Sequence, residues 1–285
     1  MLKLTQTDEQ PIYEMPYEYP RGGGAGRTSG VFRVYRSAAT GVPHDLAGIL
    51  VTSDLQGAEA SWQRPKAESR LLGEAVAEEL AVLCDLGELP PRESMGVILA
   101  GDLYVDLGLE KRGGKGDVRA IWQAFRDQFR WVCGVPGNHD LFGSTPRELE
   151  QFQAEPGIHL LDGDHVELDG LHIGGVGGII GNPSKSFRRG EQEFLDAIEE
   201  VMAVGPDMLV LHEGPSADAP GCRGSTPVRE RLERLDRTLV VCGHAHWDSH
   251  QCRSLSNATQ VVNTDARAYV IVKDENEPGV TLQHG

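Results

Sequence analysis

Side chains that can bind divalent metals follow five apolar runs of this sequence, at the point where each run ends. Asp, Asn and Gln offer oxygen donors and His offers a nitrogen donor, a mixture that suits ions of intermediate softness. Because the carboxyl ends of parallel strands meet at one edge of a sheet, side chains that follow several strands converge there. The pattern therefore predicts one metal site and the groups around it: Asp54, Gln56, Asp102, Asn138, His139, His212, His244 and His246.

Each of these residues also has a simpler explanation when it is taken alone. An Asp after a strand commonly forms a turn or caps a helix, and GNHD (137–140) has the composition of a turn. His212, within LVLHE, could be a core histidine with satisfied ring nitrogens. The recurrence at five strand ends favours the metal site. The other histidines lack this placement and are interpreted as surface or structural residues: His44, His159, His165, His172, His250 and His284.

The chain between these residues alternates apolar runs with amphipathic helical patterns, as in α/β folds. Strands are predicted before the metal-competent residues, over 48–53, 95–101, 130–135, 207–213 and 237–243. Helices are predicted over 65–87, 117–129, 145–153, 191–203 and 226–235, hairpins over 159–178, and further strands over 258–275. Residues 1–30 show no sustained period and predict an irregular N-terminal arm. We therefore expect one domain after this arm, residues 31–285.

The composition excludes several classes of protein. The 285 residues carry 43 acidic and 27 basic side chains, a formal charge of −16, which argues against binding of nucleic acid through a broad basic face. The N-terminus is polar and no apolar run approaches the roughly 20 residues that span a bilayer, so we expect a cytoplasmic protein without a membrane segment. Five cysteines without a CxxC pair argue against a disulfide framework and a thiolate zinc site. The sequence does not specify an oligomeric state.

Five short blocks occur in order along the chain: SDLQG (53–57), AGDLYVD (100–106), GNHD (137–140), LVLHEGP (209–215) and CGHAH (242–246). Together they resemble the signature blocks of the calcineurin-like metallophosphoesterases, and the resemblance extends over residues 48–246. It implies an α/β fold, a four-layer α/β/β/α sandwich of two facing mixed sheets flanked by helices. It also implies two divalent metal ions at the strand ends.

The resemblance implies a role for each ligand. Asp102 would bridge the two ions, since a shared carboxylate offsets charge between cations about 3.5–4 Å apart. The first ion would also take Asp54 and His246. The second ion would be held by three further side chains: Asn138, His212 and His244. We expect Mn²⁺ at this centre, with Fe, Zn and Mg as alternatives.

Gln56 departs from the family pattern, in which the residue two after the first Asp is a histidine. A Gln carbonyl oxygen can occupy the same coordination position, but it is a harder and weaker donor than imidazole. We therefore expect the first ion to bind less tightly and to be one that tolerates oxygen ligands, such as Mn²⁺. The alternative is that Gln56 points elsewhere and that water completes the site.

The resemblance further implies hydrolysis of a phosphate ester, in which a hydroxide held between the metals attacks phosphorus in line. His139 would stabilise the phosphoryl charge or protonate the departing oxygen. Asp106 or Asp140 would orient His139, although either is equally explained as a loop carboxylate. These three residues are the candidate catalytic groups.

Specificity must come from the surrounding loops, and the candidate substrate contacts are Asn138, Tyr104, Lys185 and Arg188. The loop 181–190 concentrates cations in an acidic chain and could bind a phosphate, or it could simply favour solubility. Pro136 stands before GNH where the protein phosphatase branch has an arginine, which argues against a phosphoprotein substrate. We expect hydrolysis of a small phosphodiester or nucleotide. The alternatives are a nuclease of the same family and a catalytically weak binding scaffold with the same fold.

Overall fold

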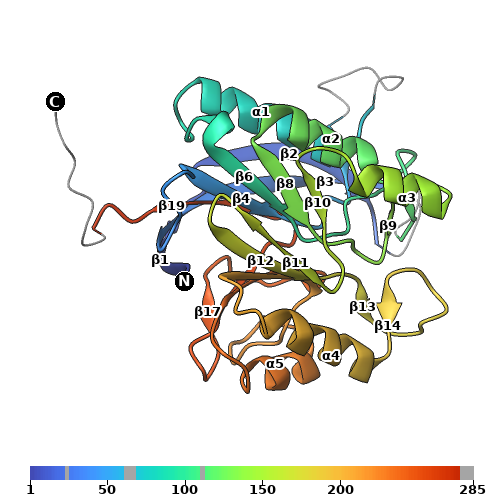
Figure 1. The fold of residues 1–285 in the computed structure, drawn as a ribbon. Helices are drawn as coiled ribbons and strands as arrows, with labels where there is room; N and C mark the ends of the chain where they lie inside the picture. The colour runs from blue at the N-terminus through green and yellow to red at the C-terminus, as the bar shows by residue number, and fades with distance from the viewer. Residues whose placement is uncertain (23–25, 61–68, 110–112, 277–285) are drawn as a thin grey trace.

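The computed structural model describes residues 1–22, 26–60, 69–109 and 113–276 of the chain. In these residues two β-sheets face each other, and helices lie on both outer sides (Figure 1). The nine-stranded sheet is flanked by α1 (Leu72–Asp85), α2 (Arg119–Gln128) and α3 (Pro146–Gln153), and the six-stranded sheet by α4 (Glu191–Met202) and α5 (Thr226–Leu232). The four-layer α/β/β/α sandwich expected from the sequence is confirmed.

The nine-stranded sheet places the ends of three parallel strands side by side. Its order is β10 (Ile158–Leu160), β8 (Trp131–Gly134), β6 (Met95–Leu99), β4 (Gly48–Thr52), β19 (Arg267–Lys273), β3 (Arg27–Thr40), β2 (Tyr13–Pro20) and β5 (Ala58–Glu59), and β1 (Lys3–Thr7) also pairs with β3. Strands β4, β6, β8 and β10 run parallel, whereas β19 pairs antiparallel with β4. Asp54, Asp102 and Asn138 follow β4, β6 and β8, so they reach the same edge of the sheet.

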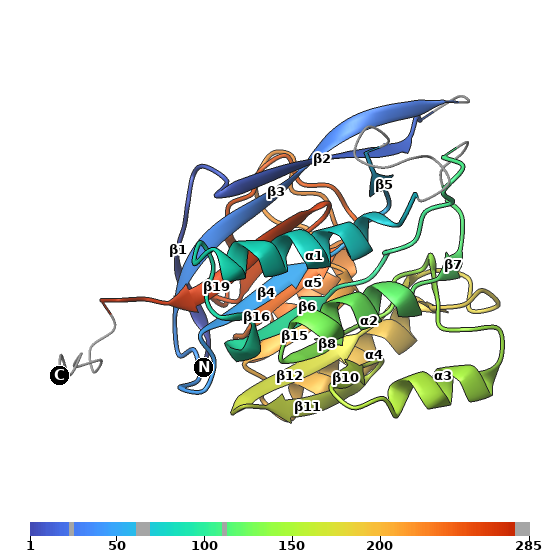
Figure 2. The ribbon, with the colours of Figure 1, turned by 90° about the horizontal axis from the view of Figure 1, so that it is seen from above.

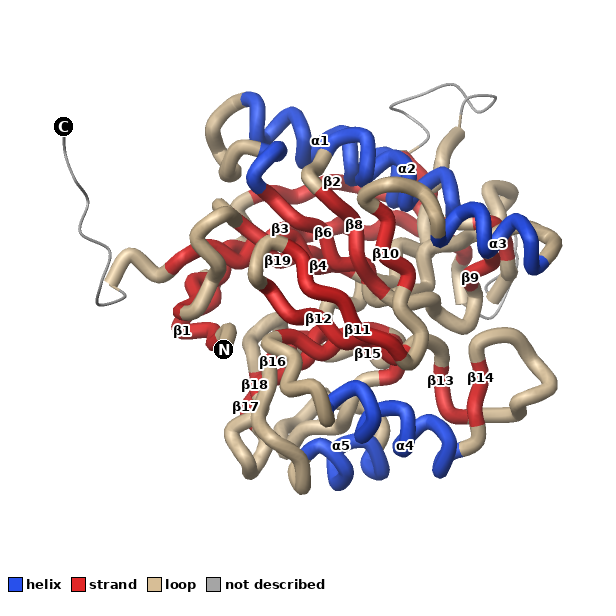
Figure 3. The backbone as a smooth tube through the Cα atoms, viewed as in Figure 1, coloured by secondary structure: helices blue, strands red, loops and turns tan. Residues whose placement is uncertain are grey.

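The six-stranded sheet brings two more strand ends to the same region. Its order is β11 (Asp164–Leu168), β12 (Leu171–Val176), β15 (Met208–Glu213), β16 (Leu239–Gly243), β18 (Gln260–Asn263) and β17 (Arg253–Ser254). Strands β12, β15, β16 and β18 are parallel, and β11 and β12 form the expected hairpin. His212 lies near the end of β15 and His244 directly follows β16. Figure 3 shows both sheets between the two helical layers.

Alternating side chains of the central strands form three apolar layers. In β4, Leu50 packs on the helix side of the nine-stranded sheet, and Ile49 and Val51 point into the layer between the sheets. In β15, Val210 points into this middle layer and Leu209 packs on the side of α4 and α5. Both faces of each sheet are therefore covered, as is usual for parallel strands. The packed layers give the loops at the strand ends a rigid base.

The expected irregular structure of residues 1–30 is wrong. Strands β1 and β2 belong to the nine-stranded sheet, and β3 runs across the expected boundary at residue 30. β2 pairs with β3 along its whole length, and Figure 2 shows this hairpin beyond α1 with β5 beside it. Pro16 and Pro20 and the charged residues hid the strand pattern, because a strand near a sheet edge tolerates proline and needs no continuous apolar face.

The predicted helices are present with somewhat different bounds. The helix expected over 65–87 is α1, Leu72–Asp85; residues 65–68 of that prediction lie outside the described residues. The last residues of the expected domain, 277–285, also lie outside them. In the described part of the chain, no helix is both long and apolar enough to cross a bilayer. The five cysteines are free thiols, as the sequence predicts.

Candidate functional site

The predicted site residues line or adjoin one cavity of about 580 Å³. Six of them line its wall: Asp54, Gln56, Asp102, His139, His244 and His246. Asn138 and His212 adjoin these side chains and are buried, with exposed fractions of 2% and 0%. The structure therefore brings together residues that are as far apart in sequence as 54 and 246.

Three of these residues have the spacing of metal ligands. Ligand atoms of Asp102, His212 and His244 all lie within 4.8 Å of one another. His212 Nδ1 donates to the carbonyl oxygen of Ala100 at 2.8 Å, and Nε2 faces Asp102 Oδ2 at 3.3 Å. The carbonyl bond fixes the ring so that Nε2 is the atom presented to the cluster.

Two buried polar atoms at this cluster form no hydrogen bond among the described residues: Asn138 Oδ1 and His212 Nε2, although His212 Nε2 faces the Asp102 carboxylate as an ion pair. A buried polar atom that is left unpaired costs roughly 1–3 kcal/mol. A divalent cation would satisfy both atoms, since amide oxygen and imidazole nitrogen are accepted ligands of such ions. The residues therefore fit the second predicted metal position.

The charges of the cluster also fit a cation. Burial raises the pKa of Asp54 well above its usual range, and the carboxylate of Asp265 raises it further. Burial acts to raise the pKa of Asp102, but the neighbouring His212 outweighs burial and holds this pKa at about 2. Burial acts to lower the pKa of His212, but Asp102 outweighs burial and raises this pKa to about 10. Burial and His212 lower the pKa of His244 to about 4, which keeps this imidazole neutral. A bound cation would offset the Asp54–Asp265 repulsion and compete with the proton of His212.

The first predicted metal position lies among Asp54, Gln56 and His246. His246 Nδ1 bonds to Asp265 Oδ2 at 2.5 Å, so Nε2 is the ring atom that remains to bind a metal, although the His246 side chain is 64% exposed and lies outside the cluster of Asp102, His212 and His244. Gln56 Nε2 donates to Asp102 Oδ2 at 3.2 Å, so the side chain points into the site. If the side-chain amide is turned by 180°, which leaves its shape unchanged, Oε1 takes the place of Nε2 and would face a cation. Gln56 is thus placed where it can bind a metal through its oxygen.

Three ligand candidates have an uncommon backbone conformation. Asp54, Asp102 and His244 have positive φ angles of 53°, 55° and 65°, a region that residues other than glycine rarely adopt. His244 N donates to Asp54 Oδ2 at 2.9 Å and helps to hold both turns. A Cβ atom on Gly137 would lie 2.1 Å from Asp102 Oδ1, and one on Gly243 would lie 2.1 Å from Asp54 Oδ2. The glycines of the GNHD and CGHAH blocks therefore make room for the carboxylates.

His139 faces the cavity beside Asp102. Its backbone N donates to Asp102 Oδ1 at 2.8 Å, and its Nδ1 lies 2.9 Å from the carbonyl oxygen of Gly114. A carbonyl can only accept, so Nδ1 carries the proton and donates. Nε2 then faces the site, 3.9 Å from Asp102 Oδ2. The Gly114 carbonyl, which the sequence did not indicate, sets the orientation of this ring.

The two carboxylates that were expected to orient His139 are engaged elsewhere. Asp140 is buried and accepts hydrogen bonds from the backbone N of Asp102, Leu103 and Gly137 at 2.9, 2.7 and 2.8 Å. Burial and the charge of Asp102 raise the pKa of Asp140 to about 6. Asp106 is exposed, and its Oδ1 accepts from Gly108 N at 2.9 Å within a turn. Asp140 thus holds the Asp102 and GNHD loops together, and the His139 ring is bonded by Gly114 instead.

The expected substrate contacts divide into two groups. Tyr104 lines the cavity, and Asn138 lies buried beside it. Lys185 and Arg188 line a separate hollow of about 340 Å³ next to β14 (Arg188–Arg189), which pairs with β13 (Ile179–Ile180). The structure does not place these two cations on the wall of the metal cavity.

A family model described as calcineurin-like phosphoesterase matches residues 48–248. The match spans more than half of the chain and contains every predicted metal ligand. The chain belongs to the calcineurin-like phosphoesterase family. The comparison with curated proteins found no match. Among solved structures, the chain is similar to a hypothetical protein from Thermus thermophilus, with 14% identity, a TM-score of 0.43, and coverage of 77% of this chain and 76% of that chain.

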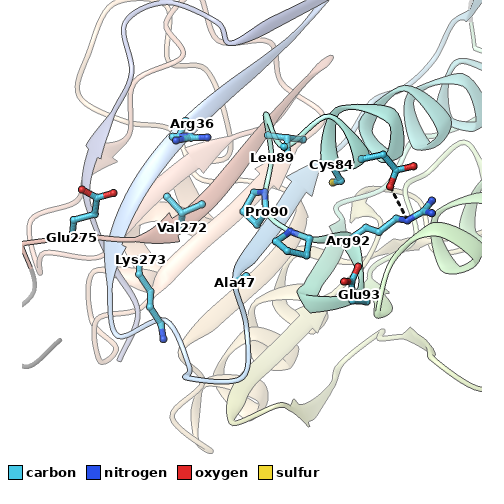
Figure 4. A pocket seen from close by; sticks show the side chains of 13 residues that line it. Arg36, Ala47, Cys84, Leu89, Pro90, Arg92, Glu93, Val272, Lys273 and Glu275 are labelled. Atoms are coloured by element: carbon cyan, nitrogen blue, oxygen red, sulfur yellow. Dashed lines mark ion pairs between the residues drawn. The ribbon is translucent and has the colours of Figure 1, made fainter. Parts of the chain in front are cut away.

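A second hollow, of about 680 Å³, lies at the other end of the strands that carry the phosphoesterase blocks (Figure 4). It is lined by Ala47 before β4, by Glu93 before β6 and by Val272 near the end of β19. Arg92 Nε pairs with Asp85 there at 3.4 Å. Its described lining residues include no histidine, so it does not resemble the metal centre.

Asp265 is a residue of the site that the sequence analysis missed. It follows β18, an apolar strand, and it lines the cavity next to His246. Its position after a strand is the same signal that revealed Asp54 and Asp102. In the calcineurin-like phosphoesterase family the recognisable blocks end before it, and the family match ends at residue 248.

An Asp265→Ala variant should lower the affinity of the first metal position by about 10–100-fold, because His246 would lose the carboxylate that fixes its ring. Asp265→Asn can still accept the proton of His246 Nδ1 and should lose less. Titration of metal-free protein with Mn²⁺, followed by calorimetry, measures the change. Unaltered affinity in Asp265→Ala would show that His246 needs no such support.

A Gln56→His variant should raise the metal occupancy of protein purified without added metal, since imidazole is the stronger donor. The unsubstituted protein should contain clearly less than two ions per chain, and the variant should approach two. Elemental analysis of both preparations makes the comparison, with Gln192→His on the exposed side of α4 as a control. Equal filling of both positions in the unsubstituted protein would contradict a weak first site.

Proposed function

We propose that this chain is a phosphoesterase that uses two divalent metal ions, with Mn²⁺ as the expected metal, to hydrolyse a small phosphodiester or nucleotide. One observation carries the proposal: among the described residues Asn138 Oδ1 is buried without a hydrogen bond, and the ligand atoms of Asp102, His212 and His244 lie within 4.8 Å of one another. A scaffold without chemistry has no need to maintain an unpaired amide oxygen and a cluster of metal-ligand atoms in its interior. The cost of this arrangement is explained if a cation is bound during function.

The residues of this chain prepare the site for that chemistry. Bound divalent ions would activate a water molecule and neutralise phosphate charge. The bond from His139 N fixes Asp102 Oδ1, so Oδ2 remains directed toward His212 and Gln56. The Gly114 carbonyl holds the His139 ring with Nε2 toward the cavity, where it can stabilise the phosphoryl group or protonate the departing oxygen.

The size and charge of the molecule support a small substrate. The cavity volume of about 580 Å³ lies in the range of roughly 300–1,000 Å³ that is usual for small-molecule sites. The formal charge of −16 disfavours the long phosphate backbone that a nuclease must follow. We therefore place a phosphodiester or nucleotide ahead of duplex nucleic acid.

Hydrolysis of bis-p-nitrophenyl phosphate and p-nitrophenyl phosphate tests the proposal, with Mn²⁺, Mg²⁺ and Zn²⁺ added in turn to metal-depleted protein. We expect turnover that depends on the metal, is highest with Mn²⁺ and is faster for the diester. Faster turnover of the monoester would overturn the expected diester preference. No turnover with any of the three metals would favour a binding scaffold instead.

A further inference from the structure

The cavity that holds the candidate metal ligands has a second wall made of aromatic side chains. Tyr17 and Tyr19 of β2 line it together with Tyr104. Tyr17 and Tyr19 precede the family match, which begins at residue 48. The shared phosphoesterase blocks therefore leave these two tyrosines without a role.

The β2–β3 hairpin holds both tyrosines on one face. Residues i and i+2 of a strand point to the same side, and the ring centroids of Tyr17 and Tyr19 lie 5.5 Å apart with a tilt of 32°. Both rings lie across Gly30, which is opposite Tyr17 in the strand register. A Cβ atom on Gly30 would lie 2.8 Å from Tyr17 Cε1 and 3.0 Å from Tyr19 Cε1. The glycine gives the rings the space that they occupy.

The β2–β3 hairpin also pairs with the segment that follows Gln56, a candidate ligand of the first metal position. Strand β5 begins soon after Gln56 and pairs with β2, with Tyr17 opposite Glu59. The Tyr17 ring packs against Gly57, where a Cβ atom would lie 2.4 Å from Cδ2 of the tyrosine. Backbone pairing therefore sets the distance between the aromatic wall and the metal ligands.

The chemistry of the wall favours a flat, uncharged group. The described residues that line the cavity include no lysine and no arginine. Two described cations act on the site from outside this wall, since Arg188 contributes to the lowered pKa of His244 and Lys115 interacts with the charge of Asp102. Tyrosine rings, in contrast, stack on planar groups, and nucleobases are the common planar groups found on phosphate esters. The cavity thus has candidate metal ligands that would bind a phosphate on one side and tyrosine rings that can stack on a planar group on the other.

We propose that Tyr17 and Tyr19 form a subsite that stacks on a planar aromatic group of the substrate, of the nucleobase type, next to the scissile phosphate. The proposal rests on the phosphoesterase function proposed above and names the part of the substrate that the N-terminal hairpin selects. The metal-binding blocks act on the phosphate, and the hairpin supplies specificity for the ester group.

Binding of adenosine 5′-monophosphate and ribose 5-phosphate, which differ only in the base, tests the subsite without requiring turnover. In the presence of Mn²⁺, calorimetry should show that the nucleotide binds at least about fivefold more tightly, which is the lower end of base stacking. Tyr19→Leu should remove most of this difference and leave the affinity for ribose 5-phosphate unchanged. Tyr19→Phe keeps the ring and should keep the difference.

Matched variants separate loss of the subsite from damage to the hairpin. Tyr13→Leu alters the same strand away from the cavity, where the Tyr13 hydroxyl donates to Glu79 at 2.7 Å, and should leave the base preference intact. Tyr17→Leu is a second variant of the subsite if Tyr19→Leu does not fold. Equal affinities of the unsubstituted protein for the two probes would overturn the subsite, as would an unchanged preference in both leucine variants. If the protein hydrolyses none of the tested esters but still binds the nucleotide more tightly than ribose 5-phosphate, the proposed function is overturned and the subsite is not.

Discussion

The Asp102→Asn variant is expected to lose at least about 10³-fold in kcat for bis-p-nitrophenyl phosphate, because this one carboxylate would serve both proposed metal positions. Asparagine has the same shape and can still accept the hydrogen bond from His139 N, which is 2.8 Å long in this structure. It lacks the negative charge that faces His212 Nε2 at 3.3 Å. The loss should therefore come from missing metal and missing charge, with the fold retained.

Two measurements accompany the kinetics of Asp102→Asn. Elemental analysis should find fewer bound ions than in the unsubstituted protein, and the thermal unfolding transition should remain cooperative. Asp127→Asn makes the same chemical change on the exposed side of α2 and should alter neither activity nor metal content. A normal metal content and normal kcat in Asp102→Asn would mean that residue 102 does not bridge the ions.

The position of the candidate metal centre could be predicted because its residues directly follow apolar strands and are also of types that bind metals. An apolar run that ends in Asp54 or in Gly101-Asp102 is visible without knowledge of the fold, and parallel strands bring such ends to one edge. The structure adds what spacing does not contain. Asp54, Asp102 and His244 turn the chain with positive φ, and Gly137 and Gly243 leave space for the carboxylates.

Other parts of the site depend on contacts between segments that are distant in sequence. Asp265 follows a strand, as Asp54 and Asp102 do, but only the fold places it against His246. The Gly114 carbonyl is a backbone atom and gives no sequence signal, yet it orients His139. Asp140 stands in the GNHD block beside the catalytic candidate, but its oxygens are taken by three backbone N–H groups. Adjacency along the chain was therefore a poor guide to hydrogen bonding.

The N-terminal hairpin was missed for a related reason. In β2 the side chains of Tyr13, Met15, Tyr17 and Tyr19 alternate with Glu and Pro, which is a strand period, but Pro16 and Pro20 obscure it and only Met15 and Pro20 become fully buried. Its stability comes from pairing with β3 and β5, which no short window of sequence reveals. An apparent arm thereby becomes one wall of the cavity.

Gln56 and Asp265 are expected to have opposite effects on the metal affinity of the first proposed position. Gln56 replaces the imidazole of the family pattern with a weaker donor, whereas Asp265 adds a carboxylate beside His246 and near Asp54. Negative charge increases the affinity for hard cations such as Mn²⁺, which accept oxygen ligands. If a metal binds at this proposed position, the added carboxylate would offset the missing histidine.

The His139→Ala variant is expected to lower kcat by about 10²–10⁴-fold, the usual range for a group that transfers or stabilises a proton in the transition state. Because the ring bonds to Gly114 and is not among the clustered ligands Asp102, His212 and His244, the metal content should not change. This combination of lost turnover and retained metal distinguishes His139 from Asp102. His165→Ala, on the exposed strand β11, is the matched control and should have normal kcat.

The leaving group decides which role His139 has. If Nε2 protonates the departing oxygen, His139→Ala should damage hydrolysis of an alkyl diester far more than that of bis-p-nitrophenyl phosphate, since nitrophenolate departs without a proton. If Nε2 stabilises charge on the phosphoryl group, both esters should lose activity by similar factors. The distance of 3.9 Å from Nε2 to Asp102 Oδ2 places the ring beside the carboxylate that is proposed to bridge the ions, a position compatible with either role. Unchanged kcat for both esters would remove His139 from the reaction and leave its ring as a packing element held by Gly114.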